Sequence, residues 1–202
     1  LLHDVPEDTH VTLAEIEKNF GKEIKNMVEG ITKLGKLKYR GVERYIENLR
    51  KMFIAMAEDI RVMIIKFADR IHNLQTLDSL PPQKQYRIAI ESLEIYAAIA
   101  NRLGMAEMKG QLEDLAFKYV HPKEYQQTKK LMDEKLRGKE KSLEELEKKA
   151  IEELKKSGIQ IVYLKGRQKR LYSFYQKLVR KGNDITKIYD AVAIRVIVPT
   201  IA

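Results

Sequence analysis

The spacing of apolar residues changes once along the chain, and this change constrains the fold more than any other feature. Up to residue 158, apolar side chains recur mainly at intervals of three and four residues, which is typical of amphipathic helices. From Ile159 to Leu164 the sequence is rich in β-branched and aromatic residues, which favours a strand. We therefore predict a mostly α protein, in which a long helical part precedes the beginning of an α+β part.

The expected helix boundaries rest on capping residues, prolines and glycines. Thr12 and Glu15 have the spacing of a capping box, and Gly21 is placed to end the helix that they begin. A loop is expected at residues 32–42. Further helices are predicted at residues 23–31, 43–59, 61–76, 82–101, 103–119 and 124–156, the last broken near Gly138.

Composition narrows the class of protein and its ligands. The 202 residues include no cysteine, which excludes disulfides and thiolate metal ligands, and no apolar run is long enough to span a membrane. A net charge of +9 favours polyanionic ligands, such as nucleotides with several phosphates or nucleic acid, although solubility alone is an alternative explanation. Because the chain lacks an initial methionine and ends directly after a strand-like run, we expect a piece of a longer protein.

The first nine residues concentrate groups that bind metal ions. His3 and Asp4 are adjacent, and Glu7 and Asp8 follow a proline. An imidazole beside a carboxylate suits a hard or borderline divalent cation, and a nearby carboxylate pair can orient or deprotonate a water on that cation. Because Val5 precedes the proline, we expect a helix to stop there, with Glu7 and Asp8 on the turn beyond it. A solvated acidic turn is the alternative.

A second stretch places polar residues on one side of an apolar helix. Asp69, Asn73 and Thr76 are spaced at i, i+4 and i+7, so they share a helix face. An aspartate in an otherwise apolar helix needs a partner, and a metal ion would supply one. Arg70, beside Asp69, is a candidate for contact with substrate phosphates.

A third stretch combines basic residues with a predicted strand. Seven basic residues and no acidic ones lie between Lys165 and Lys181. A strand, a turn at Gly166 and a basic helix could bind a triphosphate, although the Walker A spacing is absent. Asp190 precedes a second predicted strand, from Ala191 to Val198, and its carboxylate could bind Mg²⁺.

These motifs together resemble a known family. His3-Asp4 with Glu7-Asp8-Thr9, followed by Ala68-Asp69-Arg70-Ile71-His72-Asn73-Leu74, resembles the HD-type hydrolase domain of the long RelA/SpoT homologues, which hydrolyse and synthesise the alarmone (p)ppGpp. The final block resembles the start of their synthetase domain, a nucleotidyltransferase-like fold. The resemblance implies an HD hydrolase domain at residues 1–122, linking helices at 123–158 and the start of a synthetase domain at 159–202.

The resemblance also implies roles for individual residues. In the hydrolase it implies one Mn²⁺ bound by His3, Asp4, Asp69 and a histidine upstream of the chain, with Glu7 and Asp8 activating water and Asn73 and Thr76 near the nucleoside. In the synthetase it implies Mg²⁺ at Asp190 and nucleotide contacts from Gly166, Arg167, Lys169, Ser173 and Lys177. The family's usual Gly-Arg-Pro-Lys-His reads Gly166-Arg167-Gln168-Lys169-Arg170 here, so two positions depart from it.

The implied reaction removes the 3′-pyrophosphate of ppGpp or pppGpp and leaves GDP or GTP, in a cytoplasmic bacterial enzyme whose longer form also uses ATP. We expect no synthesis from this chain alone. Ribosome contact through regions outside the chain and oligomer formation stay open. Three alternatives are an HD phosphohydrolase of another nucleotide, an inactive regulatory domain of a synthetase, and a basic RNA- or ribosome-binding protein. The acidic motifs argue against the second, and the clustering of basic residues near a turn argues against the third.

Overall fold

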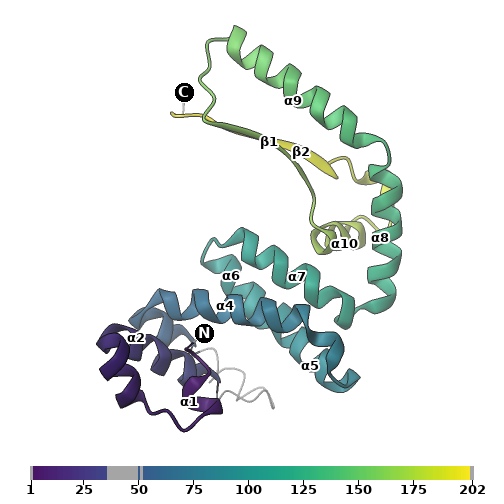
Figure 1. Cartoon of the computed structure of the whole chain (residues 1–202). Helices are drawn as coiled ribbons and strands as arrows, with labels where there is room; N and C mark the ends of the chain where they lie inside the picture. Colours follow the sequence, from purple (N-terminus) through teal and green to yellow (C-terminus); the bar gives the residue numbers. More distant parts are fainter. Residues whose placement is uncertain (1, 36–49, 51, 201–202) are drawn as a thin grey trace. The chain divides into compact units, whose positions relative to one another are not determined.

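The computed structural model describes residues 2–35, 50 and 52–200, and they form two compact units, Leu1–Ala116 and Phe117–Ala202 (Figure 1). In its described residues the first unit consists of helices joined by turns and short irregular segments, without a strand. The second contains helices and a two-stranded sheet. The prediction of a mostly α protein that continues into the start of an α+β part is therefore confirmed. Among the described residues, no helix is both long and apolar enough to cross a membrane.

The first unit is built around α4 (Ile60–Gln75), whose Val62, Met63, Phe67 and Leu74 are buried. Residues 52–58 are helical and precede it. The other elements that the structure describes in this unit are α1 (Val5–Asp8), α2 (Leu13–Gly35), η1 (Leu77–Ser79), α5 (Pro82–Glu91), η2 (Ser92–Tyr96), α6 (Ala97–Arg102) and the first part of α7 (Ala106–Val120). The prediction that the helix carrying Asp69 is central is thus confirmed.

The expectation for the first motif was wrong in its local structure. His3 and Asp4 lie in a turn instead of at the end of a helix, and Pro6 lies at the start of α1, which includes Glu7 and Asp8. The physical reason is that proline has no N–H to lose in the first turn of a helix, where that group is unpaired in any case. The proline that follows His3 and Asp4 therefore begins a helix here.

The capping box and the break at Gly21 are confirmed. The backbone N–H of Thr12 donates to Glu15 Oε2 at 2.7 Å, and that of Glu15 donates to Thr12 Oγ1 at 3.3 Å. Gly21 has φ 85° and ψ 166° and interrupts α2, a conformation that residues with a Cβ rarely adopt. The loop predicted at 32–42 is wrong for residues 32–35, which are helical, and its remainder lies outside the described residues.

The helix predicted from residue 82 to 101 contains a feature that its sequence did not indicate. A π-helical turn, η2, separates α5 from α6. Such turns are rare and often lie at functional sites. Here the turn carries Tyr96, a buried residue whose ring packs edge-on against Phe67 of α4, with 6.4 Å between the ring centroids.

The second unit packs two long helices against a small α+β element. The helices α8 (Pro122–Leu136) and α9 (Lys139–Lys156) are separated near Gly138, as predicted. The α+β element contains β1 (Tyr163–Gln168), α10 (Leu171–Arg180), η3 (Ile185–Lys187) and β2 (Val192–Ile197). A buried cluster joins α8, α10 and the segment before β2, and it consists of Met132, Phe174, Leu178, Ile188 and Ala191.

The position of the first strand corrects the prediction. β1 begins at Tyr163 instead of Ile159 and runs through Gly166, for which we expected a turn. It pairs antiparallel with β2, with Lys165 opposite Arg195 and Arg167 opposite Ala193. Because a glycine is compatible with both a turn and a closely packed strand, the residue type alone did not distinguish them.

Candidate functional site

The residues of the first two motifs converge in the first unit. His3 Nε2 lies 3.0 Å from Asp4 Oδ2 and 3.7 Å from Asp69 Oδ1. His3 and Asp4 come from the turn before α1, whereas Asp69 comes from the central helix α4. The His3 and Asp69 side chains are 17% and 14% exposed, so this is a half-sheltered group of one imidazole and two carboxylates.

Asp69 is held in place by two further residues of its own helix. Lys66 Nζ donates to Asp69 Oδ2 at 2.7 Å, and Asn73 Nδ2 donates to Asp69 Oδ1 at 3.1 Å. Burial opposes ionisation of Asp69, but the hydrogen bond and charge of Lys66, with smaller effects from His3 and Arg70, lower its pKa overall. Asp69 is therefore an anion at neutral pH. The i,i+3 spacing of Lys66 and Asp69 was visible in the sequence, yet the prediction omitted Lys66.

His3 provides the observation that bears on a metal ion. Both of its ring nitrogens are buried. Within the described part of the chain Nδ1 has no hydrogen-bond partner, and Nε2 lies 3.0 Å from Asp4 Oδ2 without hydrogen-bond geometry. An unpartnered imidazole nitrogen beside two carboxylates is a donor set that suits a divalent cation. No complete group of three or more such ligands is formed by the described residues alone. The donor types therefore fit a divalent metal ion, with at least one ligand still to be supplied.

The other residues predicted for this site take different positions. Glu7 and Asp8 are exposed on α1, and Thr76 caps the end of α4, where its Oγ1 donates to His72 O at 3.2 Å. Arg70 is largely buried. It donates through Nη2 to the Tyr96 hydroxyl at 3.0 Å and through Nη1 to Glu91 Oε2 at 3.4 Å. These contacts connect the helix of Asp69 to α5 and to the π-helical turn.

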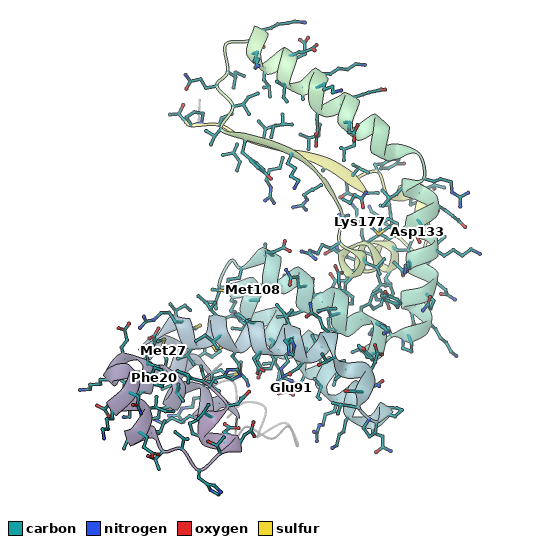
Figure 2. The ribbon with its side chains drawn as sticks, in the orientation of Figure 1. Phe20, Met27, Glu91, Met108, Asp133 and Lys177 are labelled. Carbon is teal, nitrogen blue, oxygen red and sulfur yellow. The ribbon has the colours of Figure 1, made fainter. Side chains whose placement is uncertain are left out.

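A second group of predicted residues meets in the second unit. Asp190 Oδ2 lies 2.9 Å from Lys169 Nζ, and its Oδ1 lies 2.7 Å from Lys177 Nζ. Hydrogen bonds from Lys177 and Lys169 lower the pKa of Asp190 well below its ordinary range. Lys177 projects from α10 (Figure 2), and the half-buried Ser173 lies one turn earlier in the same helix. Two ammonium groups share one carboxylate, so the cluster has a net positive charge.

The strands extend this basic surface. Along β1, Lys165 and Arg167 are exposed, whereas Leu164 and Gly166 are half-buried. Arg195, which the prediction omitted, lies directly opposite Lys165 in β2 and is also exposed. Two like charges side by side repel each other, and a polyanion would relieve that repulsion. Lys165 and Arg195 lie close together only because of the strand register. Neither a sequence motif nor the composition could therefore predict this pair.

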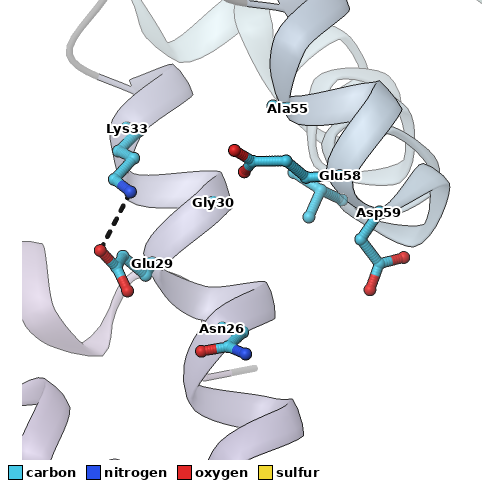
Figure 3. A pocket seen from close by; sticks show the side chains of 8 residues that line it. Asn26, Glu29, Gly30, Lys33, Ala55, Glu58 and Asp59 are labelled. Atoms are coloured by element: carbon cyan, nitrogen blue, oxygen red, sulfur yellow. Dashed lines mark ion pairs between the residues drawn. The ribbon is translucent and has the colours of Figure 1, made fainter.

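A pocket of about 320 Å³ lies elsewhere in the first unit (Figure 3). None of the predicted site residues lines it. Its polar groups are mostly acidic, and Lys33 is paired with Glu29 at 3.0 Å. The lining residues are Asn26, Glu29, Gly30, Lys33, Ala55, Glu58, Asp59 and Val62. A surplus of carboxylates makes this pocket a poor site for a phosphorylated substrate.

Comparison with known proteins identifies the family of the first unit. An HD domain model matches residues 1–106. A probable guanosine-3′,5′-bis(diphosphate) 3′-pyrophosphohydrolase of Synechocystis sp. is 46% identical over 98% of this chain and 26% of its own length. The Haemophilus influenzae protein of that name is 45% identical over 100% of this chain and 30% of its own. A GTP pyrophosphokinase of Myxococcus xanthus is 43% identical over 99% of this chain and 27% of its own.

The chain thus spans less than a third of the length of these relatives. An HD hydrolase domain implies dependence on a divalent metal ion. The domain match and the identity along nearly the whole chain confirm the resemblance on which the site residues were predicted. The chain belongs to the HD domain family and is similar to the (p)ppGpp hydrolases of the RelA/SpoT type.

Proposed function

We propose that the first unit removes the 3′-pyrophosphate of ppGpp or pppGpp and leaves GDP or GTP, with Mn²⁺ as the metal ion. The observation that carries the proposal is the meeting of His3, Asp4 and Asp69, where a buried imidazole without a hydrogen bond lies within 4 Å of both carboxylates. The substrate is taken from the similar Synechocystis and Haemophilus proteins, which are named guanosine-3′,5′-bis(diphosphate) 3′-pyrophosphohydrolases.

The proposed chemistry divides between the metal ion and the side chains. A divalent ion held by His3, Asp4 and Asp69 would polarise the 3′-phosphoryl group and acidify water. The hydroxide formed from water bonds to the phosphorus attached to the 3′ oxygen, and the bond between that phosphorus and oxygen breaks. Glu7 or Asp8 accepts the proton from the water, and a proton passes to the departing 3′ oxygen. The products are pyrophosphate and the 3′-hydroxyl nucleotide.

This proposal requires positive charge near the site, because the substrate carries two negatively charged diphosphates and must approach several carboxylates. Lys66 is nearly buried against Asp69, and Arg70 is engaged by Glu91 and Tyr96. Lys66 maintains Asp69 as an anion and adds positive charge next to the site. Asn73, which donates to Asp69, and Thr76 follow on the same helix face and remain our candidates for contacts with the nucleoside.

We propose a nucleotide site for the second unit, in which ATP and GDP or GTP bind near Lys169, Lys177 and Asp190. The contacts among these three residues support this site, because the oxygens of a polyphosphate can replace the Asp190 carboxylate as the partner of both lysines. Asp190 would then be free to bind Mg²⁺ together with the nucleotide. The name of the Myxococcus relative, a GTP pyrophosphokinase, favours this second activity for a longer protein.

The test of the first proposal is release of pyrophosphate from ppGpp in the presence of Mn²⁺. The chain should be assayed as it stands and with an upstream extension that includes the expected histidine. Asp69→Ala and Glu7→Gln should abolish release or reduce it at least a hundredfold, and Asp133→Ala, an exposed aspartate of α8 (Figure 2), serves as control.

Absence of release from a folded, metal-loaded parent would contradict hydrolysis. The first unit would then be a regulatory domain of a synthetase. The similarity to the Myxococcus GTP pyrophosphokinase is compatible with that alternative. Release from nucleotides other than (p)ppGpp with equal efficiency would favour an HD phosphohydrolase of broader substrate range. A cytoplasmic location, ribosome contact and oligomer formation remain predictions for the longer protein.

A further inference from the structure

A carboxylate of α9 binds the backbone of β1. Glu147 Oε1 accepts a hydrogen bond from the backbone N–H of Gly166, in the middle of the strand. Glu147 is half-buried, whereas Glu144, Glu145, Glu152 and Glu153 of the same helix are exposed. A side chain in a charged, otherwise solvated helix thus has a specific backbone partner 19 positions along the chain.

The direction of the Gly166 N–H explains why it needs such a partner. The N–H of Lys169 donates to Ala191 O at 2.9 Å, just before β2. Because backbone groups alternate along a strand, odd-numbered residues of β1 direct their N–H groups toward β2, and Gly166 directs its N–H toward the opposite edge. A donor at a strand edge must find another acceptor or remain in water. Glu147 is that acceptor.

Gly166 lies where two side chains of α9 approach the strand closely. A Cβ built on Gly166 would lie 2.6 Å from Glu147 Oε1 and 2.6 Å from Leu143 Cδ2. A residue with a Cβ would displace these side-chain atoms, among them the Glu147 oxygen that accepts the hydrogen bond. This close packing, not a turn, accounts for the glycine. Leu164 and Gly166 face the α9 side of β1, whereas Lys165 and Arg167 lie on the opposite, exposed side.

We propose that Glu147 is a positioning residue for nucleotide binding, which acts by fixing β1 so that the neighbouring Arg167 is presented to phosphate or base. The inference rests on the proposed nucleotide site of the second unit. The strand has a partner on one edge, β2, and Glu147 immobilises the other edge at its midpoint. A fixed strand loses less conformational freedom when Arg167 binds a ligand, and this raises affinity.

Four variants separate this role from general effects of charge or folding. Glu147→Ala removes the acceptor, whereas Glu147→Gln removes the charge but keeps an oxygen that can accept the hydrogen bond. Glu144→Ala removes an equal charge from the exposed side of the same helix. Gly166→Ala keeps the glutamate at position 147 but introduces a Cβ that would lie 2.6 Å from the present position of Glu147 Oε1, so that this carboxylate must shift.

Two measurements on the whole chain are needed, amide hydrogen exchange of residues 163–168 and the dissociation constant for ATP with Mg²⁺. In Glu147→Ala and Gly166→Ala, the backbone amide at position 166 should exchange at least tenfold faster, and the dissociation constant should rise about three- to tenfold. Glu147→Gln and Glu144→Ala should match the parent in both. The rescue by glutamine identifies the hydrogen bond, since a purely electrostatic role would be lost in that variant.

The outcomes that overturn the proposal are distinct. Unchanged exchange in Glu147→Ala shows that the contact does not hold β1. Faster exchange with unchanged ATP affinity shows that the contact supports the strand without positioning Arg167. If the parent itself binds no ATP, the proposed nucleotide site fails and the positioning role fails with it, whatever the exchange data show about the contact.

Discussion

His3 Nε2 lies 3.7 Å from Asp69 Oδ1, although one residue belongs to the turn before α1 and the other to the middle of α4. In the sequence, the segment between these two residues includes the whole of α2. The fold therefore brings an imidazole and a carboxylate from separate motifs to a distance at which one metal ion could bind both. This relationship is the basis of the first prediction.

Replacing Asp69 with asparagine should weaken Mn²⁺ binding at least tenfold. Asparagine keeps the size of the side chain but removes the negative charge that attracts the cation. Isothermal titration of the chain extended upstream would give the affinity, and Asp133→Asn provides an exposed control. Equal affinities in parent and Asp69→Asn would show that Asp69 is not a ligand.

Lys66→Met should lower the free energy of unfolding by about 1–3 kcal/mol at neutral pH. The Lys66 and Asp69 side chains are only 12% and 14% exposed, so loss of the ammonium leaves a sheltered carboxylate with Asn73 as its remaining donor. Urea denaturation of the metal-free chain would measure the change. Lys129→Met, in an exposed position of α8, should alter stability by less than about 0.5 kcal/mol; a similar loss in both variants would contradict the role of the pair.

Tyr96→Phe should also destabilise the chain, by about 1–2 kcal/mol. The Tyr96 hydroxyl accepts a hydrogen bond from Arg70 Nη2, and the Arg70 guanidinium carbon lies 4.3 Å from the centre of the Tyr96 ring. Phenylalanine keeps the ring contact but leaves a donor of a buried cation without its acceptor. Thermal or urea unfolding would detect this loss, with the exposed Tyr86→Phe as control; equal stability of Tyr96→Phe and parent would contradict it.

Lowering the pH should reduce the stability of the second unit, because Asp190 becomes protonated. Its pKa is lowered from an ordinary value of 3.8 by Lys177 and Lys169, so the unfolded chain binds a proton more readily than the folded one. The stabilisation is therefore fully present above the unfolded pKa and is lost as pH falls below about 3.8 toward the folded pKa. Because Asp190 is 46% exposed, solvent and salt screen the effect.

The measurement is the free energy of unfolding from about pH 5 to about pH 3 at low ionic strength. The parent should lose stability more steeply than Asp190→Asn, which has no carboxylate to protonate. Asp133→Asn should follow the parent curve. Parallel curves for the parent and Asp190→Asn would show that the ion pairs with Lys169 and Lys177 add nothing to stability.

Local sequence patterns were sufficient to predict most of the helices. The capping box at Thr12 and Glu15, the break at Gly21 and the apolar side of α4 each depend on residues close together in the chain. The i,i+4 relation of Asp69 and Asn73 likewise follows from helix geometry, and the structure shows it as a hydrogen bond. The proline after Val5 misled the prediction, because the same residue can end one helix or begin the next.

The sequence by itself determined the fold class, the HD motifs and the basic character of the final segment, because helix periodicity and residue chemistry are local properties. Only the tertiary structure decided that His3 meets Asp69, that Arg70 is engaged by Tyr96 of a π-helical turn, and that Gly166 lies in a strand bound by Glu147. Each of these contacts joins residues far apart in the chain. Their geometry depends on how helices and strands pack, which no short stretch of sequence specifies.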